Sequence, residues 1–356
     1  MKFFLTGGTG FLGEYLLARL LDRGHHVWCL YRNEARRLDV IDFLSSFGLP
    51  RSSKSLCWVK GDILEVDAKW DEWQARHEGL SSVDAFVHSA ASTRLHMNAE
   101  GDPLKTNVEG ARAILRLHRR YPRKVHIVST AYVCGRTQGQ TVMEVNHPRG
   151  DFVNVYEESK WEAEQLWMGN ATIFRPSIIV GDYATGRCTS FSGWYVLIEA
   201  MHMLDRLLHE HHDIDRKDLG LNVPADADGV MNIVPVDYVA EAIVRIIEIP
   251  ACHDRIYHLT HPNPPAHWFT RDFIERRFNI GGINFAGNGG PIGQPRTDVE
   301  RMVRKQAQTI HSYFYNNPDF DRTHTDAADM GMAPFPITED FLDRLLDYAI
   351  HQNWGH

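Results

Sequence analysis

Short apolar runs alternate with longer segments of helical period through most of the chain. The runs are four to six residues long and predict buried strands at residues 2–5, 26–31, 55–59, 85–88, 124–129, 171–174 and 256–259. Intervening segments carry apolar residues at positions i, i+3, i+4 and i+7, and they predict helices at residues 10–23, 103–120 and 156–168. Strands that alternate with helices indicate a parallel sheet covered on both faces. We therefore expect the α/β fold class, with a doubly wound parallel sheet.

The amino-acid composition of the chain changes after Gly181. Residues 182–230 are mostly polar and rich in histidine, and residues 262–295 hold many of the prolines and glycines. These segments predict a smaller C-terminal lobe at the carboxyl edge of the sheet, where open α/β sheets bind their ligands. The predicted division is a main domain, residues 1–181 and about 231–260, and a substrate lobe, about residues 182–230 and 261–356.

The composition excludes several classes of protein. With 46 acidic and 38 basic residues the formal net charge is -8, which offers no basic surface for duplex nucleic acid or an anionic membrane. The 5 cysteines are scattered and odd in number, so we expect neither a disulfide framework nor a cysteine metal site. Thr6, Gly7 and Gly8 interrupt the apolar N-terminus, and no later run reaches the ~18 apolar residues of a membrane span. We expect a cytoplasmic protein.

A glycine-rich turn between the first predicted strand and helix is the strongest candidate site. It consists of Thr6, Gly7, Gly8, Thr9, Gly10, Phe11, Leu12 and Gly13. Gly7 suits a tight turn, Gly10 lets a pyrophosphate approach the backbone, and Gly13 allows close packing of helix on sheet. The phosphates would then lie at the positive end of the helix dipole. This arrangement predicts a dinucleotide-binding site.

The end of the second predicted strand distinguishes between nicotinamide cofactors. NAD sites usually place Asp or Glu there to bind the ribose 2′-OH, whereas this chain has Arg32, with Arg36 and Arg37 close behind. A guanidinium cannot accept that hydroxyl bond, but its fork suits a 2′-phosphate. We therefore expect NADP, with a solvated basic turn as the alternative.

Two further strand ends are placed to contact a dinucleotide. Asp62 and Ile63 follow the third predicted strand and are positioned to hold the adenine edge. Ser89, Ala90 and Ala91 end the fourth strand and leave room for the cofactor backbone. Small residues also end ordinary buried strands, so that alternative stays open.

Ser129 and Thr130 end the fifth predicted strand, and Tyr156 and Lys160 open the helix that follows. Residues four apart share one helical face. An ammonium beside a phenol favours phenolate, which would bring the pKa of Tyr156 closer to working pH. Thr130 would hydrogen-bond a reacting carbonyl oxygen, and Lys160 would also reach the nicotinamide ribose. A solvated helix face is the alternative for an isolated pair of this spacing.

These motifs together resemble an extended short-chain dehydrogenase/reductase, within the branch of thioester reductases and fatty acyl-CoA reductases. The resemblance covers about residues 1–260. It is carried by TGGTGFLG at 6–13, GDI at 61–63, HSAA at 88–91, NVEG at 107–110, VSTAYVCG at 128–135, YEESKWEAE at 156–164, RPS at 175–177, GD and TG at 181–186, and NIVPVDYVA at 232–240.

The resemblance implies a Rossmann fold that binds NADP. It also implies that Thr130, Tyr156 and Lys160 form the catalytic group, and that Asn107 helps to hold the Lys160 side chain through a water molecule. The RPS segment joins the implied cofactor site through Arg175, Pro176 and Ser177.

The implied reaction is NADPH-dependent reduction of an acyl thioester to an aldehyde or alcohol. The acyl group would be carried by coenzyme A or by a carrier protein in trans, with Arg94, Lys105 and Arg187 as candidates for a basic patch. Two alternatives remain: a reductase or dehydrogenase of a ketone, aldehyde or alcohol, and a non-catalytic NADP-binding scaffold. A homodimer could form through the helices at 103–120 and 156–168.

Four segments of the C-terminal lobe give further predictions. The histidine-rich run at 209–213 lacks the spacing of a metal site, so we expect no metal. Trp194 and Tyr195 are candidates to line an acyl pocket, and residues 281–291 to form a mobile loop. Residues 313–323 resemble a tyrosine-rich segment of fatty acyl-CoA reductases, although a surface loop held by aromatic packing is the alternative.

Overall fold

The computed structural model describes residues 1–137, 140–210, 214–223, 225–285, 298–306, 313, 318–328 and 330–356. Its centre is a seven-stranded parallel sheet with the strand order β11-β7-β5-β4-β1-β2-β3. The strands are β1 (Lys2–Thr6), β2 (His26–Tyr31), β3 (Leu56–Lys60), β4 (Ala85–His88), β5 (Lys124–Val128), β7 (Thr172–Pro176) and β11 (Ile256–Leu259). Each predicted strand is confirmed, with shifts of two residues or fewer at its ends. The strand order reverses between β1 and β4, and such a switch point opens a crevice at the carboxyl ends of the strands.

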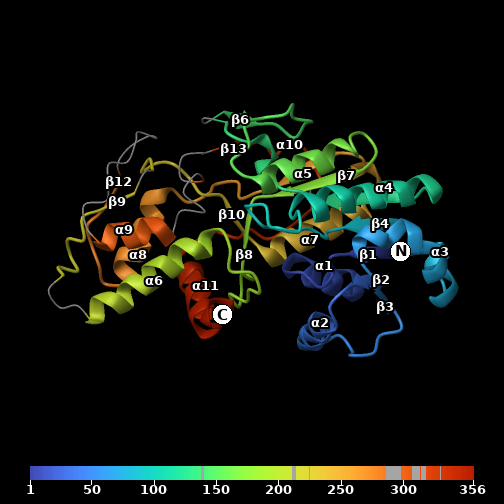
Figure 1. Cartoon of the computed structure of the whole chain (residues 1–356), viewed down its shortest axis with the longest axis horizontal. Helices are drawn as coiled ribbons and strands as arrows, with labels where there is room; N and C mark the ends of the chain where they lie inside the picture. Colours follow the sequence, from blue (N-terminus) through green and yellow to red (C-terminus); the bar gives the residue numbers. More distant parts are fainter. Residues whose placement is uncertain are drawn as a thin grey trace.

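Helices cover both faces of this sheet, as the alternation of elements predicted (Figure 1). One buried cluster joins the sheet to α1 (Phe11–Asp22), α2 (Glu34–Ser46) and α7 (Val236–Glu248). A second cluster on the opposite face involves α3 (Val66–Arg76) and α4 (Gly110–Arg120) and continues to Trp167, just beyond α5 (Val155–Gln165). The layered arrangement places the first turns of α1 and α5 at the carboxyl edge of the sheet.

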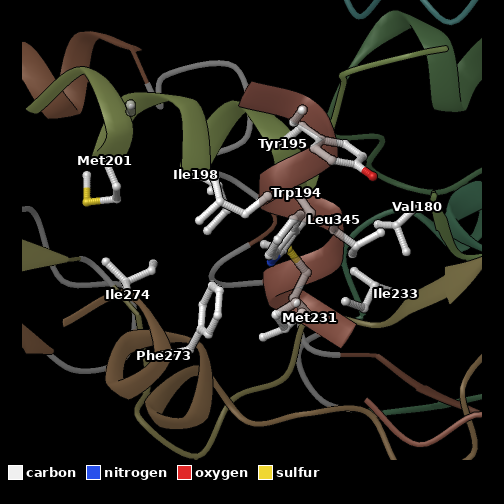
Figure 2. Close-up of a cluster of buried hydrophobic side chains, with 14 of the residues drawn as sticks. Val180, Trp194, Tyr195, Ile198, Met201, Met231, Ile233, Phe273, Ile274 and Leu345 are labelled. Carbon is white, nitrogen blue, oxygen red and sulfur yellow. The ribbon is translucent and has the colours of Figure 1, made fainter. Parts of the chain in front are cut away.

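The lobe beyond the sheet has a hydrophobic core of its own. It is built from α6 (Trp194–Glu210), α8 (His267–Arg277), α9 (Asp298–Gln306), α11 (Glu339–His351) and the strand pair β9 (Leu221–Val223) and β12 (Ile283–Phe285). These elements gather at the end of the molecule opposite α3 (Figure 1). Figure 2 shows Trp194, Ile198 and Phe273 directed into this core. The division into two domains stays a prediction.

The expectation that Trp194 and Tyr195 line an acyl pocket is wrong. Trp194 is 1% exposed and Tyr195 is fully buried, and both pack within the core of the lobe (Figure 2). The Tyr195 hydroxyl accepts a hydrogen bond from the backbone N–H of Gly181, at 3.0 Å. This bond occupies the polar end of the side chain inside the protein. Trp194 and Tyr195 at the start of α6 therefore belong to the core of the lobe and do not line the cavity.

A short segment near the C-terminus returns to the edge of the main sheet. Strand β13 (Asp319–Phe320) pairs with β6 (Thr141–Val142), and α10 (Thr323–Ala327) lies against β11. Glu144, just after β6, is 3% exposed and accepts hydrogen bonds from the His258 backbone N–H at 2.7 Å and the Thr325 hydroxyl at 2.7 Å. The second oxygen of its carboxylate accepts a bond from the backbone N–H of His324. One carboxylate thus connects three separate segments of the chain.

Candidate active site

A crevice with a cavity volume of about 650 Å³ opens at the carboxyl ends of β1, β4, β5 and β7. It brings together most of the site residues that the sequence predicted. Those lining it are Gly7, Thr9, Gly10, Phe11, Leu12, Gly13, Arg36, Ser89, Ala91, Ser129, Thr130, Tyr156, Lys160, Pro176 and Ser177. The predicted dinucleotide turn and the predicted catalytic group therefore share one cavity.

The glycine turn has the close backbone approaches that were expected of it. Gly7 has a positive φ of 78°, and a Cβ there would lie 2.4 Å from the backbone nitrogen of Ala90. A Cβ on Gly13 would lie 1.9 Å from the Gly7 carbonyl oxygen, which itself accepts the Gly10 N–H at 2.9 Å. Gly10 precedes α1 and provides no side-chain cap for it. The free N–H groups of the first turn of α1 therefore point toward the crevice, as an anionic phosphate requires.

Three of the predicted turn and strand-end residues lie behind the crevice wall. The Thr6 hydroxyl bonds the His88 ring at 2.8 Å, and both side chains are buried. Gly8 packs so tightly that a Cβ would lie 2.3 Å from the Cys29 sulfur. Ala90 contributes the backbone against which Gly7 packs. These residues shape the turn without lining the cavity.

Of the residues predicted to contact the adenosine side of the cofactor, Arg36 lines the cavity and Arg32, Asp62 and Ile63 do not. Arg36 lines the crevice and donates to the Thr9 carbonyl at 3.4 Å and to Asp39 at 3.1 Å. The Arg32 side chain is 78% exposed and pairs with Asp62 at 3.2 Å, outside the lining of the cavity. Ile63 is buried against Gly110. Arg36 is thus the arginine best placed to meet a 2′-phosphate.

The predicted catalytic side chains come from neighbouring ends of β5 and α5. The Thr130 hydroxyl accepts the Tyr132 backbone N–H at 3.3 Å, and the Lys160 ammonium donates to the Val128 carbonyl at 2.7 Å. Tyr156 is the second residue of α5, one turn before Lys160, and it lines the crevice. The Asn154 side chain caps this helix by accepting the Glu157 N–H at 3.0 Å. The cap fixes the turn that presents Tyr156.

Asn107 supports this group from a buried position rather than from the cavity wall. Its amide donates to the Ser159 hydroxyl at 2.8 Å and to the Ser92 carbonyl at 3.0 Å, and its carbonyl accepts the Ser92 N–H at 2.7 Å. Asn107 therefore connects the loop after β4 to the residue that precedes Lys160. A water-mediated contact with the lysine itself stays a prediction.

The protonation of the site differs from the sequence expectation. Burial raises the pKa of the Tyr156 phenol above its ordinary value of 10, with a smaller contribution from the nearby Glu157 carboxylate. Burial also lowers the pKa of Lys160 to about 8, partly offset by the Glu164 carboxylate. The expectation that the lysine would bring the phenol toward working pH is wrong here, because burial and the Glu157 carboxylate both raise the pKa of Tyr156. Tyr156 is thus held as a neutral proton donor.

Arg175 is not a cofactor ligand in this structure, which corrects the prediction. Its side chain is fully buried and donates two hydrogen bonds to Glu164, at 3.0 and 2.7 Å, and one to the Val145 carbonyl at 3.0 Å. Glu164 lies on α5, away from the crevice. The two residues after Arg175 do line the cavity. Within the RPS segment, the arginine stabilises the fold and only Pro176 and Ser177 face the site.

The three candidates for a basic carrier-binding patch differ in whether their side chains are exposed. Arg187 is bonded to the buried Glu14 at 2.5 Å and lies over the Phe43 ring at 4.0 Å. Its guanidinium is therefore engaged within the protein, and Arg187 is not available for a carrier. Arg94 and Lys105 are exposed.

Several lining residues were not predicted as site residues, although Val128, Tyr132 and Tyr313 lie in segments that carry the family resemblance. They are Thr93, Leu95, Val128, Tyr132, Ile178, Ile179, Thr189, Ser190, Ser192, Gly193 and Tyr313. Tyr132 follows Thr130 by two residues, so the fifth strand end offered a signal for it. Tyr313 lies 157 positions after Tyr156, and only the tyrosine-rich resemblance pointed to that segment.

The cavity offers polar groups that suit a nicotinamide dinucleotide. The Ser129 hydroxyl is buried and has no hydrogen-bond partner among the described residues, although Ser129 lines the crevice. Across the same cavity lie the glycine turn and Arg36, which suit a pyrophosphate and a 2′-phosphate. The residues present therefore fit such a cofactor.

Neither a metal cluster nor a membrane-spanning helix is found in the part of the chain that the structure describes. His209 is exposed at the end of α6, and residues 211–213 of the histidine-rich run lie outside the described residues. Most of the predicted mobile loop, residues 286–291, and residues 314–317 of the tyrosine-rich segment also lie outside them.

Comparison with known proteins agrees with this geometry. A family model described as male sterility protein matches residues 5–243. The chain is 30% identical to the aldehyde reductase lnaA of Aspergillus flavus over 297 residues, which cover 74% of this chain and 26% of that protein. It is 27% identical to a protein of the linear gramicidin synthase of Brevibacillus parabrevis over 293 residues, 73% of this chain and 5% of that protein. A putative dihydroflavonol 4-reductase of Synechocystis is 30% identical over 166 residues, 46% of this chain and 43% of that protein. The chain thus spans less than half the length of each of these relatives.

Solved structures share the fold over nearly the whole chain. The terminal R domain of the myxalamid PKS-NRPS pathway superposes with a TM-score of 0.74 at 23% identity, covering 99% of this chain and 91% of that one. A thiolation-reductase di-domain of an archaeal non-ribosomal peptide synthetase gives a TM-score of 0.75 at 20% identity, covering 100% and 76%.

Other structures of this fold hold nicotinamide cofactors. A yeast methylglyoxal/isovaleraldehyde reductase complexed with NADPH has a TM-score of 0.65 at 14% identity, covering 99% of each chain. A dTDP-glucose 4,6-dehydratase of Bacillus anthracis in complex with NAD has the same TM-score at 16% identity, covering 99% and 98%. At these identities the likenesses establish the shared fold, and the bound cofactors are those of the solved proteins.

Proposed function

The chain belongs to the male sterility protein family, and we propose that it is an NADPH-dependent reductase of an acyl thioester. The observation that carries this proposal is that Thr130, Tyr156 and Lys160 line the same cavity as the glycine turn. Relatives named as a gramicidin synthase, a terminal R domain and a thiolation-reductase di-domain support a thioester on a carrier protein. Coenzyme A could present the same bond.

The chain's own residues would bind and polarise the thioester carbonyl. A nicotinamide bound in the cavity would supply hydride to the carbonyl carbon. The Tyr156 phenol and the Thr130 hydroxyl would donate hydrogen bonds to the carbonyl oxygen, where negative charge develops. Each such donor contributes about 3–4 kcal/mol to the stabilisation of a developing oxyanion.

Proton transfer completes the step. Tyr156 would give its proton to the oxygen, forming a hemithioacetal, and the Lys160 ammonium could then restore the phenol. The raised pKa of Tyr156 suits this role, because the residue stays protonated at neutral pH. Collapse of the hemithioacetal breaks its carbon–sulfur bond and releases an aldehyde and a thiol. A second round of the same chemistry would convert the aldehyde to an alcohol.

Reduction of a free aldehyde or ketone is the second candidate function. It is favoured by relatives named as an aldehyde reductase and a dihydroflavonol reductase. The same donors would act on either carbonyl, so the cavity chemistry alone fits both. A non-catalytic NADP-binding scaffold would have no use for the assembled Thr130, Tyr156 and Lys160.

One assay separates these candidates. NADPH consumption is measured against acyl-coenzyme A, carrier-bound acyl and free aldehyde substrates, and the products are identified. We expect turnover of thioesters, and a loss of kcat of about 10²–10⁴-fold in Tyr156→Phe. Turnover of free carbonyl compounds with none of thioesters would establish the second candidate. Undiminished biological activity of Tyr156→Phe would support the scaffold.

The NADP preference and the dimer are also proposals. Arg36 in the cavity supports NADP, since its guanidinium suits a 2′-phosphate. A dimer would form through α4 and α5, and sedimentation that shows only monomer at micromolar concentration would remove it.

A further inference from the structure

Tyr313 enters the crevice from a segment far from every motif of the site. It lines the same cavity as Thr130 and Tyr156, and it is 9% exposed. Its ring meets the edge of the Tyr132 ring, with centroids 5.1 Å apart and an interplanar angle of 83°. The backbone N–H of Tyr132 in turn donates to the Thr130 hydroxyl. Two aromatic rings therefore form one wall of the cavity next to the carbonyl-binding residues.

The polar end of Tyr313 is fixed on the helix that carries the catalytic residues. Its hydroxyl donates to the Glu157 carboxylate at 2.8 Å and accepts from the Asn154 amide at 2.8 Å. Glu157 is fully buried, and its other oxygen accepts the Val153 N–H at 2.9 Å. Glu157 is adjacent to Tyr156 in the sequence.

These bonds give the ring a defined position. A tyrosine hydroxyl that both donates and accepts within the first turn of α5 has little rotational freedom. The ring is thereby held at a constant place relative to the Tyr156 phenol. No element of the cofactor turn contacts it among the interactions described, so its role concerns the other end of the cavity.

We propose that Tyr313 is a specificity-determining residue that contacts the group attached to the reacting carbonyl, and that Glu157 and Asn154 hold it there. This inference rests on the proposed reductase function. With Tyr132, the ring limits the space beside the carbonyl carbon. Small acyl groups fit this space, and bulky acyl groups meet the ring.

The test is a comparison of acetyl-coenzyme A and benzoyl-coenzyme A with wild type, Tyr313→Ala and Tyr313→Phe. Removal of the ring in Tyr313→Ala is expected to raise the benzoyl/acetyl ratio of kcat/KM by about 10-fold or more, the scale on which pocket size discriminates substrates. Tyr313→Phe keeps the ring but loses the bonds to Glu157 and Asn154, and it is expected to raise the ratio by less than Tyr313→Ala does. The matched control is Phe320→Leu, because the Phe320 ring also packs on Tyr132, with centroids 5.6 Å apart, but does not line the cavity.

The NADPH dissociation constant of each variant serves as the measure of folding and is expected to stay within about 2-fold of wild type. An equal loss of kcat/KM on both thioesters, or an unchanged ratio in Tyr313→Ala, would overturn the inference. If Tyr313→Ala does not bind NADPH, Tyr313→Leu provides the same test with a smaller cavity.

Acetaldehyde and benzaldehyde are run in parallel to separate the two proposals. If wild type reduces only these aldehydes and no coenzyme A or carrier-bound thioester, the thioester function fails while the ratio for the aldehydes still tests Tyr313. If wild type reduces neither class of substrate, both proposals are rejected.

Discussion

Replacement of Arg175 by methionine tests whether this arginine stabilises the fold or binds the cofactor. The change leaves the Glu164 carboxylate, whose side chain is 1% exposed, without the two hydrogen bonds that the guanidinium donates. Removal of one partner of a buried ion pair costs about 3–5 kcal/mol, because the other charge is left unpaired. We expect the free energy of unfolding in Arg175→Met to fall by that amount.

A double variant at positions 164 and 175 measures how much of the stability loss comes from the unpaired charge. Arg175→Met combined with Glu164→Leu removes both charges and leaves the Val145 carbonyl, on a residue that is 51% exposed, without its donor. The double variant leaves no unpaired buried charge, so it should be more stable than either single variant. The coupling between the two sites is therefore expected to exceed about 2 kcal/mol.

Urea unfolding followed by tryptophan fluorescence measures these stabilities, and titration with NADPH measures cofactor affinity. We expect folded Arg175→Met to bind NADPH within about 2-fold of wild type, because the side chain does not line the cavity. A loss of NADPH affinity of about 10-fold or more with unchanged stability would refute the structural role. Additive stability losses in the double variant would equally contradict a buried pair.

Substitutions at three other places probe the turn, the phosphate contact and the core. Gly13→Ala should abolish NADPH binding in a fluorescence titration, since the added methyl would lie 1.9 Å from the Gly7 carbonyl oxygen; retained affinity would show that the turn tolerates the shift. Arg36→Ala should weaken NADPH binding by about 10-fold or more and leave NADH binding unchanged. Arg32→Ala, outside the cavity lining, should reduce NADPH affinity by less. Equal losses of affinity for both coenzymes in Arg36→Ala would argue against a phosphate contact. His126→Leu should stabilise the fold by about 1–3 kcal/mol, because both ring nitrogens of the buried His126 are without hydrogen-bond partners in the described part of the chain. Burial lowers the pKa of His126 to about 3 from 6.5. The free energy of unfolding of the wild type should therefore fall by about 1.4 kcal/mol per pH unit as pH falls below 6.5. Urea unfolding at pH 7 and pH 5 should show a smaller fall in His126→Leu than in the wild type.

The strands and the dinucleotide turn could be predicted from sequence because their signals are local. Each buried strand is a short apolar run, and the glycine spacing of the turn lies within residues 6–13, although Gly7 packs on the distant Ala90. The spacing of Tyr156 and Lys160 likewise places both on one face of α5 without any knowledge of the rest of the chain.

Helices α2 and α3 were not predicted, because their apolar faces are narrow. Only Val40, Phe43 and Leu44 are buried in α2, and Trp70 and Trp73 with Val66 in α3. Such sparse patterns resemble polar surface segments, and their burial is decided by neighbouring elements.

The orientation of individual side chains was the other limit. Arg175 belongs to a motif of the cofactor edge, yet its guanidinium turns to a carboxylate on α5. Tyr313 reaches the site only because the C-terminal segment returns across the molecule. No local pattern contains such long-range pairings.

The carboxylate of Glu144 has a practical consequence for exchanging C-terminal segments between members of this family. A chimera that joins a foreign C-terminal part to residues 1–260 would keep this buried acid but could lose the backbone donors of residues 324 and 325. Such a hybrid would keep the His258 donor but leave the second oxygen of the Glu144 carboxylate without a partner beside the outermost strand, which is unfavourable for a buried acid. Crossover points that transfer Glu144 together with residues 318–328 would keep the acid with its own donors, and recombination designs should treat these distant stretches as one inherited unit.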